Sequence, residues 1–505
     1  MSTGAESLEA SVGKERLDRR LLAFVTPIRL LFLLVLLGGL LRLYRYDSLS
    51  LWVDEGLTVG FGRLPWDVVL GLHGAYETHP PLYFVLVKIA GLFAPELTAG
   101  RLVSVVAGTL TLPVVYALGA MLIGRRGALV AAGVLALSPL HIWYSQEARP
   151  YAFTLLAVSV SYLALAGFHR TLNRRWCLLY GVAVAVSLYA NYSAAYALAP
   201  QGLLLVYLLA AHGKRALWMW VAGIGGVAAF LPWVPQLLNT VQGRGTAVEN
   251  YLGVSMEKVG YSVLSIVGLG GQGSYFWGTS PTAWERWPAL QWAMLAALLV
   301  ACVVGIVAII RRGLFGLLCA VGLFAGTIIV CAAISLISAG YAERTVIFAL
   351  VGWTLVAGAA AVAPLARGWR WAGAGALVVV LLFGLVSLWA MYRGGDKQHW
   401  RELAHDAAAL ARSGETLLLY PSVTGVLLDA YQRHEFDGAI VIADFGKLPD
   451  AVRPALGMKA LWLAYIETGG LEQLQGQLAE RGYVRVEHRY YWHPMWLDHY
   501  VASDE

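Results

Sequence analysis

From residue 21 to about residue 391, the chain is a succession of long apolar runs separated by short segments that carry paired arginines or lysines. A helix crosses the hydrocarbon core of a bilayer with about 20 predominantly apolar residues, and most of these runs have that length. Only 13% of the residues are charged, compared with about 25% in soluble domains, so a soluble core cannot bury the apolar excess. The sequence therefore predicts an α-helical polytopic membrane protein with about eleven spans. We expect these spans near residues 21–43, 101–123, 127–144, 151–169, 177–191, 195–211, 216–238, 289–310, 313–337, 345–364 and 371–391.

The basic clusters orient the predicted spans, because cytoplasmic loops carry an excess of Lys and Arg. When all of these clusters are placed in the cytoplasm, every Asp and Glu between residues 21 and 391 falls on the outer side. This topology requires that residues 81–94 do not cross, and we expect them to form a helix in the membrane interface because the run is short and contains Lys88. The N-terminal segment 1–20 is then cytoplasmic, and residues 44–100 form a long first outer loop within a membrane domain of residues 21–392.

Residues 393–505 have a different character. Strand-like runs such as TLLLY, AIVIAD and ALWLAYI alternate with helical patterns such as WRELAHDAAALARS, which predicts a small extracytoplasmic α/β domain. This tail is acidic whereas the membrane part is basic, a distribution that argues against nucleic acid as a partner and identifies the basic excess as a topology signal. The four cysteines lie in apolar stretches and form no CxxC pair, so neither a disulfide framework nor a thiolate metal site is indicated.

The first outer loop contains the adjacent carboxylates Asp54 and Glu55, a few residues after a predicted span and beside Trp52. At the lipid boundary one of them could act as a general base, since partial desolvation makes a carboxylate a better proton acceptor. We therefore treat both as candidate catalytic residues. The alternative interpretation is an acidic start of a surface helix.

The same loop ends in the sequence His79-Pro80-Pro81-Leu82-Tyr83. The paired prolines fix an extended entry into the interfacial helix, which would aim His79 at the membrane surface, where it could contact a phosphate. The alternative is a structural histidine beside a proline turn. We count Lys88 with His79 among the candidate phosphate-binding residues, and Tyr83 among the candidate substrate contacts.

A third motif, YSQEARPY, runs from Tyr144 to Tyr151 between two predicted spans. An acid, an arginine and two tyrosines in a tight turn at a membrane boundary are costly unless they are used. Arg149 suits a phosphate because its planar fork donates two parallel hydrogen bonds. The alternative is a Glu147–Arg149 pair within the turn, flanked by tyrosines of the interfacial belt. Arg344, just before a later span, could be a second phosphate cation or a headgroup anchor.

Together these motifs resemble the GT-C superfamily of glycosyltransferases, in particular the bacterial branch related to protein O-mannosyltransferases and aminoarabinose lipid A transferases. The match rests on the Asp54–Glu55 pair, on HPPL from His79, on YSQEARPY from Tyr144, and on DKQHWRELA from Asp396 to Ala404. The resemblance implies a polyprenyl-phosphate-sugar donor, transfer on the outer face of a bacterial plasma (inner) membrane, and a juxtamembrane helix in the first loop.

The resemblance also implies roles for individual residues. Asp54 takes the place of the catalytic base, and Glu147 stands where the family often has a second acid. Some relatives use a lysine against the donor phosphate, where this chain has His79, so Arg149 or Arg344 would neutralise that phosphate. Tyr83, Tyr144 and Tyr151 are expected at the substrate. Some relatives hold a divalent metal and others need none, so no cofactor is required and a divalent metal is possible.

The expected reaction follows from the chemistry of such a donor. A sugar joined through C1 to a phosphate already has a good leaving group, so the enzyme needs a base for the acceptor and cations for the departing phosphate. The acceptor could be a lipid, a glycan or a protein, attacked through a hydroxyl or an amine, with inversion at C1. The alternative from another class is a transporter or flippase of a lipid-linked glycan, and a further one makes the tail an interaction module.

Overall fold

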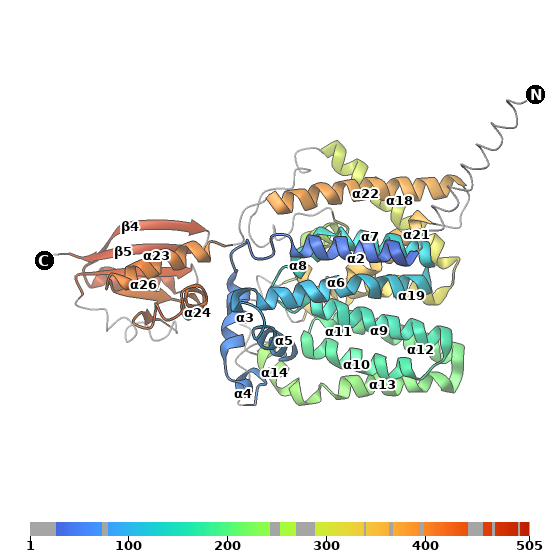
Figure 1. Ribbon diagram of the computed structural model, residues 1–505, viewed down its shortest axis with the longest axis horizontal. Coiled ribbons are helices and arrows are strands. Elements are labelled where there is room, and N and C mark those ends of the chain that lie inside the picture. The colour runs from blue at the N-terminus through green and yellow to red at the C-terminus, as the bar shows by residue number, and fades with distance from the viewer. Residues whose placement is uncertain are drawn as a thin grey trace, which may run out of the picture.

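The computed structural model describes residues 27–72, 79–242, 253–268, 288–337, 340–362, 367–393, 398–442, 458–466, 470–492 and 495–503. The predicted cytoplasmic segment 1–20 lies outside these residues. Roughly parallel helices form a bundle, and a small α/β domain projects from one end of it (Figure 1). This arrangement confirms the predicted helical membrane domain with a C-terminal α/β domain.

The bundle consists of nineteen α-helices among the described residues, joined in places by single turns of 3₁₀- or π-helix. The α-helices are α2 (Pro27–Leu43), α3 (Val53–Arg63), α4 (Trp66–Val69), α5 (Leu82–Ala90), α6 (Glu96–Leu122), α7 (Arg125–Ala136), α8 (Pro139–Ser145), α9 (Tyr151–Thr171), α10 (Arg175–Ala190), α11 (Ala194–Leu198), α12 (Gln201–His212), α13 (Leu217–Ala228), α14 (Val234–Gln242), α16 (Met256–Ile266), α18 (Pro288–Ile310), α19 (Leu314–Val321), α20 (Thr327–Ser335), α21 (Ala349–Ala361) and α22 (Arg367–Arg393). The single turns are η1 (Gly213–Ala216), η2 (Leu231–Trp233), η3 (Gly322–Gly326) and η4 (Glu343–Thr345).

Fewer helices than predicted meet a strict criterion for crossing a membrane. Within the described ranges, six are long and apolar enough, and a seventh is added if α7 and α8 form one span bent by 60°. One of the six, Ala194–Asn239, is a 46-residue run that contains both α12 and α13, and it turns at Gly213, whose φ is +59°. Three further predicted spans are the shorter helices α2, α10 and α21, of 17, 16 and 13 residues, so the count of eleven includes helices that do not meet the criterion.

The predicted continuous span 127–144 is wrong in one respect. Pro139 has no N–H to continue the backbone ladder, so α7 ends at Ala136 and a new helix starts with Ser138 as its cap. The buried guanidinium of Arg42 donates to the carbonyls of Leu135 and Ala136 at this break.

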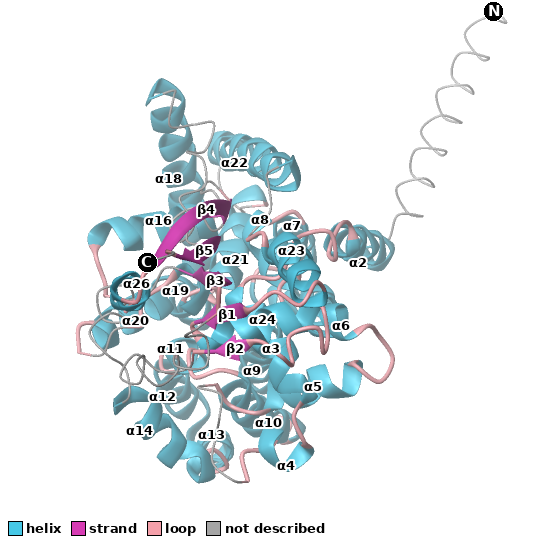
Figure 2. Ribbon diagram, turned by 90° about the vertical axis from the view of Figure 1, so that its left-hand side faces the viewer, coloured by secondary structure: helices cyan, strands magenta, loops and turns pink. Residues whose placement is uncertain are grey.

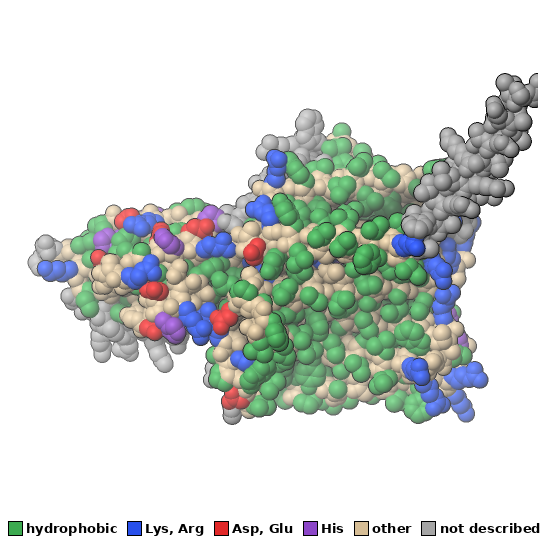
Figure 3. Space-filling model, viewed as in Figure 1, with side chains coloured by type: hydrophobic (Ala, Val, Ile, Leu, Met, Phe, Trp, Pro, Cys, Tyr) green, Lys and Arg blue, Asp and Glu red, His purple; other side chains and the backbone are tan. Residues whose placement is uncertain are grey.

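Charge is distributed unevenly along the bundle. Lys and Arg gather at the end away from the α/β domain, and Asp and Glu lie toward the domain (Figure 3). The basic end contains the junctions α6–α7, α9–α10, α12–α13 and α18–α19. The predicted topology requires this asymmetry, and the orientation with the basic end in the cytoplasm stays a prediction. Helix α5 has nine residues, about 14 Å of helix, so it is too short to cross.

The α/β domain is a five-stranded sheet of order β2-β1-β3-β5-β4 with helices on both faces. Its elements are β1 (Leu417–Tyr420), β2 (Ile440–Val441), β3 (Ala460–Ile466), β4 (Tyr483–Trp492), β5 (Met495–Ala502), α23 (Trp400–Arg412), α24 (Ser422–Tyr431) and α26 (Leu471–Glu480). β1 pairs in parallel with β2 and β3, with Leu418 opposite Leu463, and β5 is antiparallel to β3 and β4. Helices α23 and α24 cover one face and α26 covers the other, which buries β1 and β3 on both sides.

The domain meets the bundle through α24, which packs against α3 (Figures 1 and 2). Gly56 and Gly60 face α24 one helical turn apart, and a Cβ atom on Gly56 would overlap the Leu427 side chain. Arg63, at the end of α3, donates a 2.7 Å bond to the Asp429 carboxylate. The domain therefore lies directly against the helix that begins the candidate site.

Candidate active site

The first turn of α3 carries both predicted carboxylates. Successive residues of a helix point about 100° apart, so the two side chains enter different surroundings. Glu55 has no exposed surface, whereas the Asp54 side chain is 28% exposed.

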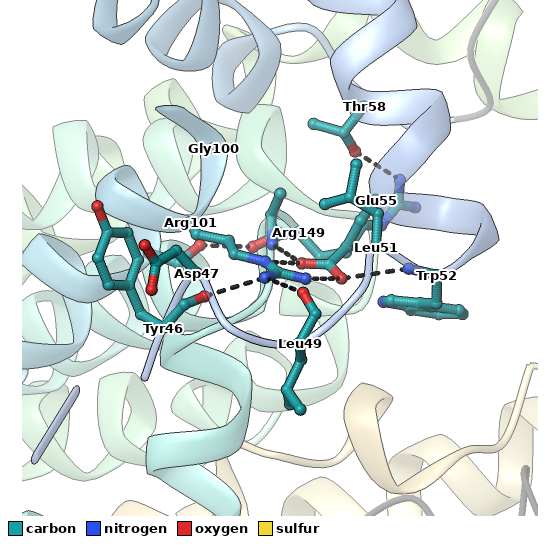
Figure 4. Close-up of polar contacts among 12 residues, drawn as sticks. Tyr46, Asp47, Leu49, Leu51, Trp52, Glu55, Thr58, Gly100, Arg101 and Arg149 are labelled. Atoms are coloured by element: carbon teal, nitrogen blue, oxygen red, sulfur yellow. Dashed lines mark hydrogen bonds and ion pairs between the residues drawn. The ribbon is translucent and has the colours of Figure 1, made fainter. Parts of the chain in front are cut away.

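Glu55 forms a buried bidentate pair with Arg101 of α6 (Figure 4). The two bonds measure 2.7 and 2.8 Å, and the Ala148 amide donates to the same carboxylate at 2.8 Å. The Arg101 guanidinium also donates to the carbonyls of residues 46, 49 and 50. A buried charge pair is tolerable only when its polar atoms are satisfied, as they are here. Glu55 therefore joins α3, α6 and the turn after α8, and its carboxylate cannot be reached by an acceptor, which corrects the prediction of a catalytic role.

Asp54 and Arg149 meet on the open side of α3. Their side chains approach to 4.0 Å between Oδ2 and Nη2, and Nη1 of Arg149 donates to the Asp54 carbonyl and to Thr58 Oγ1, both at 3.2 Å. His79 completes the cluster, with Nδ1 3.3 Å from Nη2 of Arg149. Three residues predicted from three separate motifs thus lie together, as the resemblance implied.

Tyr83 lies behind this cluster and not in it. Its hydroxyl donates to the Gly100 carbonyl at 2.9 Å and lies 2.9 Å from Ser104 Oγ, which in turn donates to the Arg149 carbonyl. The ring is fully buried, and burial raises the pKa of Tyr83, so the hydroxyl remains a neutral hydrogen-bond donor. Tyr83 supports the backbone of Arg149, which corrects the prediction that it contacts substrate.

Aromatic rings and a second cation border the cluster. The Arg344 guanidinium lies 5.9 Å from the centre of the ring of Trp52, which is two residues before Asp54. Tyr144 donates to Glu343 at 3.1 Å, and its ring packs edge-on against Tyr151 with centroids 5.2 Å apart. Arg344 and the two tyrosines therefore remain candidates for contact with a substrate.

Glu147 lies in the turn between α8 and α9 and is 3% exposed. It is close enough to interact electrostatically with Tyr144 and Tyr151. The next residue, Ala148, donates its amide to Glu55, so the turn that holds Glu147 is fixed by the buried pair. Its role as a second acid stays a prediction.

Lys88 is not part of the cluster. Its ammonium donates to the carbonyls of Gly62 and Leu64 at 3.1 and 2.6 Å and lies 5.2 Å from the Trp66 ring. It caps the end of α3, about 12 Å along the helix from Asp54. The prediction that Lys88 binds the donor phosphate is corrected for this reason.

Sequence reasoning missed several residues of the site. Arg101 stands alone at the start of an apolar run, and an ionisable residue there is expected to have a buried partner, which would have pointed to Glu55. Thr58 lies one turn after Asp54, where a hydroxyl bound to the Asp54 carbonyl is a local helical contact. Gln398 lies in the fourth motif, but no signal in the sequence connects it with α3.

The described residues contain no group of three or more His, Cys, Asp or Glu side chains that could hold a metal ion. Asp54 and His79 supply two potential ligands, and the neighbouring Arg149 occupies the space between them with positive charge. This set does not fit a divalent cation held by protein ligands, so no step of the chemistry is assigned to a metal.

Comparisons with known proteins find one partial family match and several structures of similar fold. Residues 78–238 match the family model of dolichyl-phosphate-mannose-protein mannosyltransferases. The structure resembles ArnT from Cupriavidus metallidurans in the apo state, with a TM-score of 0.57 and 15% identity over 93% of this chain and 97% of that one. The same protein bound to undecaprenyl phosphate gives a TM-score of 0.55 and 14% identity over the same shares.

A second likeness is to the archaeal oligosaccharyltransferase AglB from Archaeoglobus fulgidus, solved with an inhibitory peptide and a dolichol-phosphate. The TM-score is 0.52, with 13% identity over 87% of this chain and 69% of that one. No curated protein sequence matches the chain. At these identities the structural likenesses establish the fold.

Proposed function

The chain has the fold of the GT-C glycosyltransferases, and from that premise we propose that it transfers a sugar from a polyprenyl-phosphate carrier to an acceptor on the outer face of the membrane. The observation that carries the proposal is the convergence of Asp54, His79 and Arg149 at the open side of α3, with Asp54 Oδ2 4.0 Å from Arg149 Nη2. This places a proton acceptor beside a fixed guanidinium. The undecaprenyl phosphate and dolichol-phosphate bound by the two similar proteins support a lipid phosphate as the carrier.

We assign Asp54 the role of general base. Its carboxylate takes the proton of an acceptor hydroxyl or amine as the acceptor atom bonds to C1 of the sugar. The bond between C1 and the phosphate oxygen breaks, and polyprenyl phosphate leaves with the electron pair. A single displacement of this kind inverts the configuration at C1.

The departing phosphate requires positive charge that is already in place. Arg149 is suited to this role because Thr58 and the Asp54 carbonyl fix one of its terminal nitrogens, while the other points toward His79. Arg344, at the Trp52 ring, supplies a second cation from another segment. The buried aromatic rings of Tyr144 and Tyr151 border the same region and would exclude water from it.

The test uses purified protein in lipid nanodiscs with a panel of polyprenyl-phosphate sugars and with lipid, glycan and peptide acceptors. Mass spectrometry measures consumption of the donor, release of polyprenyl phosphate and formation of a new glycosidic bond. Asp54→Asn is expected to remove transfer, and Asp47→Asn, an exposed residue in the same loop, serves as the matched control. Movement of a lipid-linked glycan between leaflets without a new bond would establish the flippase alternative and end the proposal.

A further inference from the structure

We propose that Gln398 and Tyr431 of the C-terminal domain are positioning residues that hold the start of α3 and, through it, Asp54. The inference rests on the proposed function, because it explains how the proposed base is held. It extends that function by making the C-terminal domain a working part of the catalytic unit.

The N-cap residue of α3 supplies no side-chain cap, and the one local contact is from the Trp52 N–H to the Glu55 carboxylate at 3.4 Å. The first N–H groups of a helix have no partner within the helix, and a side-chain oxygen at the preceding residue usually accepts from one of them. Trp52 occupies that position and has no such oxygen. The Val53 N–H instead donates to Oε1 of Gln398 at 3.0 Å, 345 residues later in the chain. Gln398 is 2% exposed, and the same oxygen accepts from the Trp400 indole at 2.7 Å.

The turn that precedes α3 is held by the same domain. The Leu51 N–H donates to the hydroxyl of Tyr431, which also lies 3.0 Å from Ser50 Oγ. The Arg401 N–H donates to Ser50 Oγ at 3.2 Å. Burial raises the pKa of Tyr431, so its hydroxyl remains neutral and able both to donate and to accept. Residues 50, 51 and 53 are therefore all bound by the C-terminal domain, directly before Asp54.

The body of α3 is held as well. The absence of side chains at Gly56 and Gly60 lets α24 approach, with Leu427 and Val426 filling the space that Cβ atoms would take. At the far end of α3, Arg63 pairs with Asp429. On the inner side of α3, the Glu55–Arg101 pair fixes the helix to the bundle. Helix α3 is thus held on its outer side by the C-terminal domain and on its inner side by the membrane domain.

This arrangement predicts that loss of the contacts from the C-terminal domain lowers the turnover rate. A shift of about 1 Å in a catalytic group can cost on the order of 100-fold in rate without any loss of the group itself. Removal of the Gln398 acceptor leaves two donors, the partly buried Val53 N–H and the buried Trp400 indole, without that partner. Since Trp52 has no side-chain oxygen to replace it, we expect the first turn of α3, including Asp54, to move or fray.

The experiment compares Gln398→Met and Tyr431→Phe with a matched control, Tyr465→Phe. Met keeps the length of Gln but accepts no comparable bond. Tyr465 donates its hydroxyl to the buried Asp498 within the domain's own sheet, so its removal also costs a buried hydrogen bond. Amide hydrogen exchange of residues 50–56, thermal unfolding, kcat and donor KM are measured for the intact protein in nanodiscs.

We expect both variants to lower kcat by about 10- to 100-fold with donor KM unchanged within about two-fold, because neither substitution removes Arg149 or Arg344 and Thr58 still holds Arg149. Exchange at residues 50–56 rises in both variants and stays at the wild-type level in Tyr465→Phe. Gln398→Glu retains an acceptor oxygen, and we expect it to restore protection of the Val53 amide and most of kcat.

The inference would be overturned if Tyr431→Phe had the same kcat and the same amide exchange as Tyr465→Phe, and the transferase assignment would remain intact. A loss of kcat of the same size in both variants would also overturn it, because that result indicates general destabilisation. If Gln398→Met does not fold, Tyr431→Phe decides, since it removes one oxygen atom. If the wild-type protein transfers no sugar, the proposed function fails, and the exchange data still report whether the domain holds α3.

Discussion

The two sides of α3 use similar charged groups in opposite ways. On the inner side, Glu55 and Arg101 are buried, bidentate and joined to backbone groups of the loop before α3 and of the turn at Ala148. On the open side, Asp54 is 28% exposed and lies 4.0 Å from Arg149. Both oxygen atoms of the inner carboxylate accept structural hydrogen bonds, whereas the Asp54 carboxylate is partly exposed to solvent. For this reason we propose the partly exposed Asp54, and not the fully bonded Glu55, as the base.

The largest effect that this comparison predicts is on turnover. Asp54→Asn keeps the size of the side chain and removes the proton acceptor, so we expect kcat to fall by about 10²- to 10⁴-fold. The thermal unfolding midpoint is expected to match that of the wild type, because no buried pair is broken. Single-turnover kinetics and thermal unfolding in the same nanodiscs measure both quantities. Near-normal turnover would remove Asp54 as the base.

The neighbouring substitution is expected to do the reverse. Glu55→Gln leaves Arg101 buried beside a neutral amide, and we expect it to lower the free energy of unfolding by about 3 kcal/mol, at the low end for a broken buried pair. Gln can still accept one of the hydrogen bonds, which limits the loss. Denaturant unfolding measures the change. A matching loss in Asp54→Asn would show that the two sides of α3 do not differ as described.

Part of this contrast was predictable from the sequence. The apolar runs and basic pairs indicated a helical membrane domain, and the motifs indicated that Asp54, Glu147 and Arg149 would lie in one pocket, of which the structure brings Asp54 and Arg149 together with His79. The separate fates of Asp54 and Glu55 were not predictable, because they depend on which side of α3 faces Arg101, 46 residues later. Two adjacent acids in a sequence do not indicate which of them faces the helix bundle.

The same limit explains the contribution of the C-terminal domain. Its α/β pattern is visible in the alternation of strand and helix runs. Its contact with α3 depends on Gln398, Tyr431 and two glycines that allow close packing. None of these residue types is unusual in its local sequence, so only the assembled fold connects them with the site.

A smaller effect is expected from a substitution of Arg149, the cation on the open side of α3. Arg149→Lys keeps the charge and loses the planar fork that reaches Thr58, the Asp54 carbonyl and His79 together. We expect kcat/KM for the donor to fall about ten-fold, which corresponds to about 1.4 kcal/mol. Arg433→Lys, an exposed position on the C-terminal domain, is the control. Wild-type kinetics in Arg149→Lys would mean that the guanidinium does not bind the phosphate.

The smallest effect concerns the far end of α3, where positive charge serves structure again. Lys88→Met keeps the aliphatic stem and removes the ammonium that donates to the Gly62 and Leu64 carbonyls. Loss of this cap is expected to lower stability by about 1 kcal/mol, because the last carbonyls of the helix lose a charged partner. Donor KM should remain within about two-fold of the wild type, since about 12 Å of helix separates Lys88 from Asp54. An increase in donor KM as large as that in Arg149→Lys would instead place Lys88 at the phosphate. The phosphate-binding region would then reach from the start of α3 to its end.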